Sequence, residues 1–175
     1  MSFTILPYVE RDGIRTVTDS TMKTLWLKTV QEDLHDIIFY EGTITSEDQF
    51  LAMAKASGTM FYLLFDDNDL VGYTWLNRFE NKSARMHYCV FKHYWGQTLE
   101  IGKFVLNKLL TQPLEDNTFL FDLLTGFVPA WNKKAINFSL KCGGKTYGEI
   151  PNAIYNAKTK QSEPAVFIYY TRGDV

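Results

Sequence analysis

A short glycine-bearing segment, WGQT at residues 95–98, stands where a strand pattern changes to a helix pattern. Side chains alternate with period two over residues 84–91, and apolar residues then recur at helical spacing over 98–111. A strand that turns through glycine into a helix presents unpaired backbone N–H groups at the positive end of the helix dipole. This arrangement is typical of an anion site, most often for a phosphate. A glycine in isolation is more often only a tight turn.

Other reactive side chains form weaker patterns. Cys89 and His87 share one face of the predicted strand, but a general base must lie across from its nucleophile within hydrogen-bond reach. We therefore interpret both as buried strand residues. The histidines at 35, 87 and 93 lack metal-ligand spacing, and the acidic cluster at 66–69 is typical of a solvated turn. No metal site is predicted.

Composition predicts one ordinary globular domain over residues 1–175. Hydrophobic residues make up 46% of the chain and charged residues 22%, which suits a single substantial core. The net charge is −2, and the lack of a basic face disfavours a nucleic-acid partner. The sequence has neither an apolar run of membrane-spanning length nor a signal-peptide pattern. Two isolated cysteines suit a cytoplasmic protein with reduced thiols.

Periodicity and turn residues predict an α/β fold. Strands are expected at 3–9, 14–17, 60–65, 70–79, 84–91, 119–127, 145–155 and 165–171, and helices at 20–38, 46–58, 98–111 and 132–141. Thr18 or Asp19 would cap the first helix, which would run about five turns. The three strands within 60–91 predict an antiparallel meander, and the apolar run at 119–127 predicts a strand paired in parallel after a helical crossover. The result is a mixed, mostly antiparallel sheet with a central parallel pair and about four helices.

Two motifs in this element order resemble the GNAT superfamily, the Gcn5-related N-acetyltransferases. CVFKHYWGQTL at 89–99 is similar to the family's pyrophosphate loop, and its aromatic-Trp-Gly form is especially like the branch that acetylates protein N-termini and small amines. In VPAWNKKAINFSLKCGG at 128–144, Asn132, Ala135 and Gly143 match the family's asparagine, small residue and helix-ending glycine. Similarity at the level of residues spans about 60–144, and residues 1–58 match by element order only.

The resemblance implies that the central parallel strands splay apart and that acetyl-CoA, the acyl donor, places its pantetheine arm between them. Backbone groups at 88–90 would pair with this arm, the amides of 96–99 would hold the pyrophosphate, and an amide near Val90 would stabilise the oxyanion. The amine substrate would approach from the loop at 40–45 and the last hairpin. The implied cofactor-binding residues are Cys89, Val90, Trp95, Gly96, Gln97, Thr98, Leu99 and Asn132.

The chain departs from the family pattern at three places. Thr98 replaces the second glycine of the loop. Ser139 stands where the family has a tyrosine that returns a proton to the departing thiolate, and a serine hydroxyl is a poorer acid than a phenol. Ala84 and Met86 stand where some members place a Glu or His base, so Tyr88 is the local substitute on that face. Tyr88 and Ser139 are therefore the candidate catalytic residues.

Three possibilities remain open. The first is an acetyl-CoA-dependent N-acyltransferase that transfers an acetyl group directly to an amine of a small molecule or protein. Such transfer can proceed without a protein base, because waters can take the proton and positioning supplies much of the rate. The alternative is a catalytically inactive GNAT-fold module for binding or assembly, for instance a phage accessory protein. A third is a fold of similar element order without a CoA site. The sequence identifies neither the acceptor amine nor the oligomeric state, a homodimer included.

Overall fold

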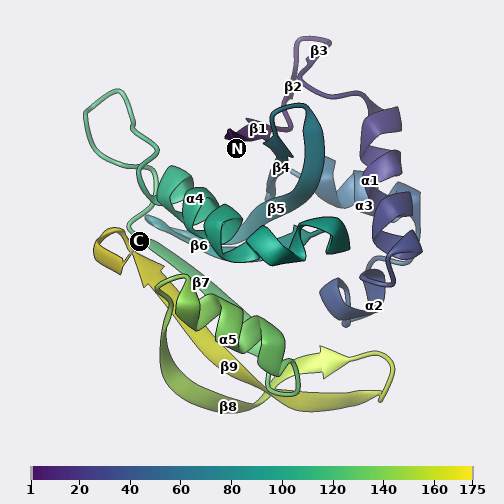
Figure 1. The fold of residues 1–175 in the computed structure, drawn as a ribbon, viewed down its shortest axis with the longest axis vertical. Coiled ribbons are helices and arrows are strands. Elements are labelled where there is room, and N and C mark those ends of the chain that lie inside the picture. The colour runs from purple at the N-terminus through teal and green to yellow at the C-terminus, as the bar shows by residue number, and fades with distance from the viewer. Residues whose placement is uncertain (1, 175) are drawn as a thin grey trace. The chain divides into compact units, whose positions relative to one another are not determined.

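The computed structural model describes residues 2–174, which form an α/β fold (Figure 1). The strands are β1 (Phe3–Pro7), β2 (Glu10–Arg11), β3 (Ile14–Arg15), β4 (Met60–Asp66), β5 (Asp69–Glu80), β6 (Ser83–Val90), β7 (Leu123–Pro129), β8 (Lys145–Asn156) and β9 (Gln161–Thr171). The helices are α1 (Asp19–Gln31), α2 (His35–Ile38), α3 (Glu47–Lys55), α4 (Thr98–Leu110) and α5 (Lys133–Lys141), with 3-10 helices η1 (Lys92–Gln97) and η2 (Arg172–Asp174). The strand order is β1-β4-β5-β6-β7-β9-β8, with β2-β3 as a separate hairpin.

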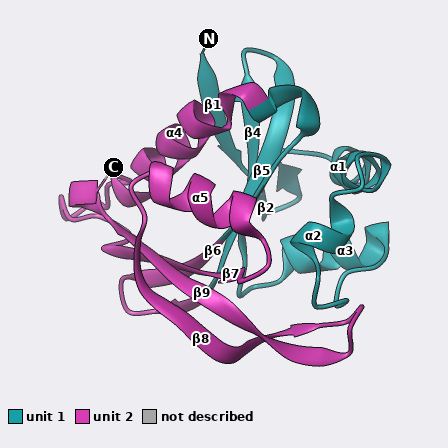
Figure 2. Cartoon of the chain, turned by 60° about the horizontal axis from the view of Figure 1, so that its bottom comes forward, with its two compact units in different colours: residues 1–77, 87–95 teal, residues 78–86, 96–175 magenta. Residues whose placement is uncertain are grey.

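The chain forms two compact units (Figure 2). The first contains the residues up to Asn77 together with His87–Trp95, and the second contains Arg78–Met86 together with the residues from Gly96 onward. The chain passes from one unit to the other within β5, within β6 and again at the end of η1. The single-domain organisation over 1–175 stays a prediction.

The first unit contains the antiparallel half of the sheet. β1 pairs with β4, and β4 pairs with β5 with a register shift after Leu64. The second half of β6 follows β5, because the Thr74 hydroxyl donates to the His87 carbonyl at 2.6 Å and the Phe91 amide donates to the Val71 carbonyl at 3.0 Å. These contacts run in opposite directions along the two strands, so the predicted meander is confirmed.

An aromatic core fills the space between this half of the sheet and helices α1 and α3. Phe50 of α3 packs edge-on against Phe61 and Tyr73, with ring centroids 5.6 and 5.4 Å apart, and Phe61 stacks on Tyr73 at 5.5 Å. Trp26 of α1 lies 5.8 Å from Phe50. Large rings that alternate along strands and recur on helices therefore meet in one buried cluster.

The predicted first helix over 20–38 is wrong in its length. The structure ends α1 at Gln31 and begins the separate helix α2 at His35. Between them Asp33 adopts φ +53°, and the amide of Leu34 donates back to the Thr29 carbonyl at 2.9 Å. A left-handed residue of this kind closes a helix. The apolar stripe hides the break because Leu34 and Phe39 belong to the same core cluster as α1.

Thr18, one of the two predicted caps of the first helix, is its N-cap, and Ser46 is the N-cap of α3. The Thr18 side chain accepts a hydrogen bond from the Thr21 amide, and the Ser46 side chain accepts one from the Gln49 amide. The strands expected at 3–9 and 14–17 are shorter than predicted, because β1 ends at Pro7 and β2-β3 is a two-residue hairpin.

The second unit contains the parallel pair. β6 pairs in parallel with β7 from Ser83 opposite Leu123 to Arg85 opposite Thr125, as predicted for a strand reached through a helix. β7 then pairs antiparallel with β9, which pairs with β8. The strand expected at 119–127 starts at Leu123 instead. Phe119 forms an isolated bridge with Pro113, and Phe121 is buried in a loop whose carbonyl accepts from Arg172 at 2.6 Å. β9 begins at Gln161 rather than 165, so the polar turn before it is shorter.

Replacing Gly72 of β5 with alanine tests how β6 is held. A Cβ at this position would collide with the backbone carbonyl oxygen of Cys89, which cannot move without shifting the strand. We expect Gly72→Ala to lower the free energy of unfolding by about 1–3 kcal/mol, the usual cost of overpacking, in urea denaturation. Gly58→Ala is the matched control, because a Cβ there meets no atom within 4 Å. Equal stability of the two variants would contradict the close contact.

Candidate functional site

The predicted anion loop is an exposed turn that leads into α4. Gln97 is the N-cap residue, and its side chain makes no capping hydrogen bond. Gly96 and Leu99 are exposed, and a Cβ built on Gly96 meets no atom within 4 Å. The first amides of α4 therefore lack the side-chain cap that most helices use, and the space above Gly96 is open. This is the geometry of a helix N-terminus that can hold an anion.

One buried acceptor lies in the same turn. Within residues 2–174 the Gln97 Oε1 atom is buried and has no hydrogen-bond partner. An unpaired buried acceptor costs free energy unless a ligand or water satisfies it. A carbonyl oxygen cannot pair with a phosphate oxygen, so its natural partner is an N–H or O–H group. The turn thus offers backbone donors and one side-chain acceptor.

Trp95 is hydrogen-bonded to the end of β6. The indole nitrogen of Trp95 donates to the Val90 carbonyl at 3.0 Å, while the Trp95 side chain stays largely exposed. Cys89 and Val90 themselves are buried. The indole therefore uses one of the backbone acceptors that the resemblance gives to pantetheine, although a carbonyl can accept a second bond. Trp95 is positioned by its own strand, and its role beside a ligand stays a prediction.

Asn132 lies at the N-terminus of α5 in the second unit. Its Oδ1 atom accepts a hydrogen bond from the Ala135 amide at 3.1 Å, so it is the N-cap of the helix. The side-chain NH₂ group retains its donors for another partner. The adjacent Trp131 donates from its indole nitrogen to Glu163 at 2.9 Å, which ties the start of α5 to β9. α5 ends as predicted, with Gly143 at φ +100°.

Ser139, the position of the family's tyrosine, faces a tyrosine of β9. Ser139 is only 8% exposed and lies beside Tyr170. Burial raises the pKa of Tyr170 to about 12, and the neighbouring Ser139 side chain acts to lower it. No sequence pattern predicts this pair, because it depends on the register of β9 against α5. The Tyr170 phenol therefore lies beside Ser139, the residue that stands in place of the family's tyrosine.

The two faces of β6 carry different chemistry. Cys89 and Phe91 point into the aromatic core of the first unit, and His87 lies on the same face by alternation. The His87 ring stacks on Trp75 with centroids 4.5 Å apart, and its Nε2 atom lies 3.2 Å from Asn77 Oδ1. Tyr88 lies on the opposite face. The predicted burial of Cys89 is confirmed, whereas His87 is only partly buried.

The predicted site residues are divided between the units. Tyr88, Cys89, Val90 and Trp95 belong to the first unit, and Gly96, Gln97, Thr98, Leu99, Asn132 and Ser139 belong to the second. The parallel ladder of β6 and β7 spans Ser83–Arg85 and precedes residues 88–90. The splay of these strands and the assigned ligand contacts stay predictions.

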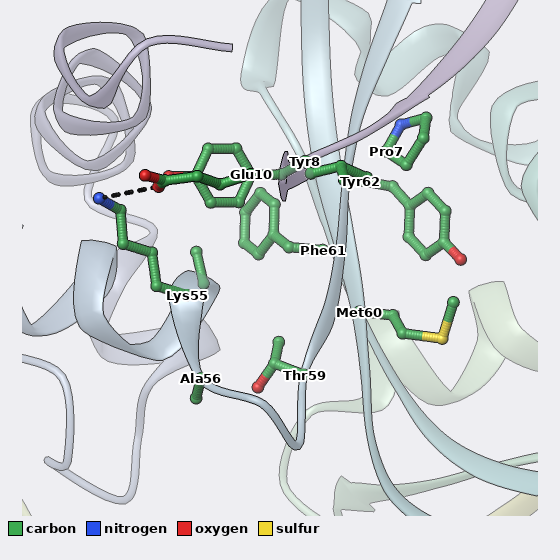
Figure 3. A pocket seen from close by; sticks show the side chains of 11 residues that line it. Pro7, Tyr8, Glu10, Lys55, Ala56, Thr59, Met60, Phe61 and Tyr62 are labelled. Carbon is green, nitrogen blue, oxygen red and sulfur yellow. Dashed lines mark ion pairs between the residues drawn. The ribbon is translucent and has the colours of Figure 1, made fainter. Parts of the chain in front are cut away.

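A pocket of about 650 Å³ lies elsewhere in the first unit (Figure 3). It is lined by the end of β1, the end of α3 and the start of β4, and contains none of the predicted site residues. Lys55 lies 3.4 Å from Glu10 on one side, while Tyr62 extends from the other side of β4 (Figure 3). The charged side chains that line this pocket, Lys55 and Glu10, pair with each other.

No group of three or more His, Cys, Asp and Glu side chains within residues 2–174 could hold a metal ion. None of the helices in this part of the chain is long and apolar enough to cross a membrane.

Solved structures resemble this fold closely, although no family model and no curated protein matches the sequence. Spermidine N-acetyltransferase from Vibrio cholerae, in complex with CoA and spermine, is 14% identical with a TM-score of 0.69, covering 98% of this chain and 96% of that one. RimL, a ribosomal L7/L12 alpha-N-protein acetyltransferase, is 16% identical with a TM-score of 0.72, covering 90% and 88%. The microcin C7 self-immunity acetyltransferase MccE, in complex with acetyl-CoA and AMP, is 15% identical with a TM-score of 0.67, covering 88% of each chain. The chain has the GNAT fold, which confirms the predicted fold class.

The two thiols should be unreactive in the folded protein. Burial raises the pKa of Cys89 to about 12 and that of Cys142 to about 11, so almost no thiolate exists near neutral pH. We expect a disulfide reagent such as DTNB to label neither thiol at pH 8 in the native state, and both at once in urea. Rapid labelling of one thiol in the native protein would contradict the buried, structural role of these residues.

The cap at Asn132 should contribute measurably to stability. We expect Asn132→Ala to lower the free energy of unfolding by about 1 kcal/mol, because the Ala135 amide loses its partner. Asn132→Ser keeps an oxygen acceptor at the N-cap and should retain most of the stability. If the serine and alanine variants unfold at the same urea concentration, the cap is not the stabilising contact.

Proposed function

We propose that this protein is an acetyl-CoA-dependent N-acyltransferase that moves an acetyl group directly to an amine of a small molecule or protein. The observation that carries the proposal is the N-terminus of α4, where the N-cap residue Gln97 makes no side-chain capping hydrogen bond and the space above Gly96 is open. Its support from known proteins is the GNAT fold, since structures of that fold hold CoA with spermine or acetyl-CoA with AMP. Backbone amides bind a pyrophosphate without needing particular side chains, which suits a chain of low sequence identity to these neighbours.

Acetyl-CoA would meet this chain at separate groups of residues. The amides of Gly96, Gln97, Thr98 and Leu99 would hold the pyrophosphate, and the Thr98 hydroxyl could donate a further bond. Backbone groups of Cys89 and Val90 would pair with the pantetheine arm, with Trp95 beside them. The NH₂ group of Asn132 would donate to the same arm while its oxygen caps α5.

Transfer requires that the amine is neutral when it attacks and that the departing CoA thiolate takes up a proton. The amine nitrogen forms a bond to the thioester carbonyl carbon, the C–S bond breaks, and the thiolate takes a proton. Two catalytic residues are proposed. Tyr88 lies on the face of β6 that carries Met86, and Ser139 lies on α5. In this proposal a proton would pass from the neighbouring Tyr170 phenol through Ser139 to the thiolate.

A second candidate function is a catalytically inactive GNAT-fold module that binds a ligand or partner. The observation that favours it is the burial of Ser139 beside Tyr170. A buried hydroxyl is poorly placed to give a proton to a bound ligand. Acetyl transfer to any amine would exclude this candidate.

Self-association and a reducing location are further parts of the proposal. One neighbour of the same fold, a spermidine N-acetyltransferase, is dodecameric, which supports testing for a homodimer or larger assembly by light scattering. The two cysteines are free and buried, which suits a cytoplasmic compartment.

Binding of acetyl-CoA is tested by thermal shift with a charge-matched control. At 100 times its dissociation constant the ligand should stabilise the protein by about 2.7 kcal/mol. Gly96→Glu should abolish this stabilisation, because its carboxylate would project into the open space that the phosphates need. Gly58→Glu adds the same charge where a Cβ also meets no atom within 4 Å, and should leave the shift intact.

The outcomes separate the two functions. A shift that Gly96→Glu removes, together with acetyl transfer to spermine, spermidine or a peptide with a free N-terminus, supports the transferase. A shift without transfer to any amine or water supports the binding module. No shift with acetyl-CoA contradicts both functions at this site.

A further inference from the structure

Glu163, near the start of β9, accepts hydrogen bonds from side chains of three separate segments. The Thr159 hydroxyl donates to its Oε1 atom at 2.6 Å, and the Asn156 NH₂ group lies 3.1 and 3.0 Å from its two oxygens. The Trp131 indole nitrogen donates to Oε2 at 2.9 Å. Hydrogen bonds from Thr159, Asn156 and Trp131 hold the pKa of Glu163 below its usual value, so the carboxylate is ionised at neutral pH. One fixed charge therefore joins the β8-β9 hairpin to the segment that leads into α5.

The turn between β7 and α5 is held on β9 at two adjacent points. The Ala130 amide donates to the Pro164 carbonyl at 3.0 Å. The next residue of the turn, Trp131, is bonded to Glu163, which directly precedes Pro164. Trp131 is 46% exposed, so burial does not by itself hold its ring. The bond to Glu163 is therefore a main restraint on the orientation of this side chain.

Asn132 is the residue that this turn presents at the start of α5. Its backbone amide donates to the Pro129 carbonyl at 2.8 Å, and its Oδ1 atom accepts from the Ala135 amide at 3.1 Å. A carboxamide is planar, so a bond at its oxygen also restricts the direction of its NH₂ group. The direction of these two donors thus follows the backbone of residues 130–132, and a small rotation of the turn would misdirect them.

We infer that Glu163 is a positioning residue of the proposed acetyl-CoA site, which acts through Trp131 to direct the NH₂ group of Asn132 toward the pantetheine arm. The inference rests on the proposed function and identifies what holds the Asn132 donors in place. Glu163, Trp131, Asn132 and the N-terminus of α4 all belong to the second unit. A donor that is already oriented loses less conformational entropy when the ligand binds, which increases affinity.

The contact itself is testable without a ligand. Nitrogen-15 NMR of the indole N–H groups, with the Trp131 signal assigned by comparison with Trp131→Phe, should show a shifted Trp131 signal in Glu163→Ala at neutral pH, because the charged acceptor is lost. Glu149→Ala is the matched control, since it removes the same charge from an exposed position of β8, and it should leave the signal unchanged. An unchanged Trp131 signal in Glu163→Ala would overturn the inference.

Two ligands separate the positioning of Asn132 from general stability. CoA carries the pantetheine arm, and 3′-phospho-ADP is its nucleotide part without that arm. Trp131→Phe keeps an aromatic ring but removes the N–H group that Glu163 accepts, so in calorimetry we expect it to weaken CoA binding by up to about tenfold, the contribution of one neutral hydrogen bond. Binding of 3′-phospho-ADP should not change. Glu163→Ala should show the same pattern, and Glu163→Gln should bind CoA more tightly than Glu163→Ala, because its amide oxygen can still accept from Trp131.

A double-mutant cycle with Asn132 identifies the route of the effect. In the Asn132→Ala background the loss of CoA affinity caused by Trp131→Phe should disappear, because the directed donor is already absent. A further loss of the same size, equal weakening of both ligands, or unchanged CoA binding in Trp131→Phe would each overturn the role of Glu163 while leaving the acetyl-CoA site in place. Failure of the wild-type protein to bind both CoA and 3′-phospho-ADP would contradict the proposed function, and this inference with it.

Discussion

The burial of Cys89 and Phe91 in the aromatic core of the first unit is the constraint on which the candidate site depends. These two side chains fix which face of β6 points toward helices α1 and α3. Because strand residues alternate, the same constraint places His87 on that face and Tyr88 on the other. The close approach of Gly72 to the Cys89 carbonyl holds β6 against β5 and leaves little freedom for a shift in register. The orientation of one strand therefore decides which reactive groups face which environment.

The proposed anion site that follows β6 depends mainly on backbone amides. η1 leads from β6 into α4, and the first amides of α4 have no side-chain cap from Gln97. Trp95 fixes the end of the strand through the Val90 carbonyl. A site made of amides, a glycine turn and a helix dipole constrains few side chains, so it can persist where the sequence has diverged. The chain has the fold of known acetyltransferases at 14–16% identity.

Local signals predicted the parts of the fold that local physics controls. The strand-turn-helix unit, the cap at Thr18 and the parallel pairing of β6 with β7 follow from periodicity, capping and crossover rules. The break between α1 and α2 was missed, because Asp33 in a left-handed conformation leaves no mark in an apolar stripe that continues past it. The pairs Ser139–Tyr170 and His87–Asn77 were also missed. Each joins residues on different elements, and only register brings them together.

The central claim is that an anionic ligand, the pyrophosphate of acetyl-CoA, binds at the N-terminus of α4. The most direct measurement is a titration of the nitrogen-15-labelled protein with CoA, followed through its backbone amide resonances. Binding at this site predicts that the amides of Gly96, Gln97, Thr98 and Leu99 shift most and earliest. The account would be contradicted if CoA left these four amides unchanged, or if the largest shifts fell on the pocket residues of β1 and α3.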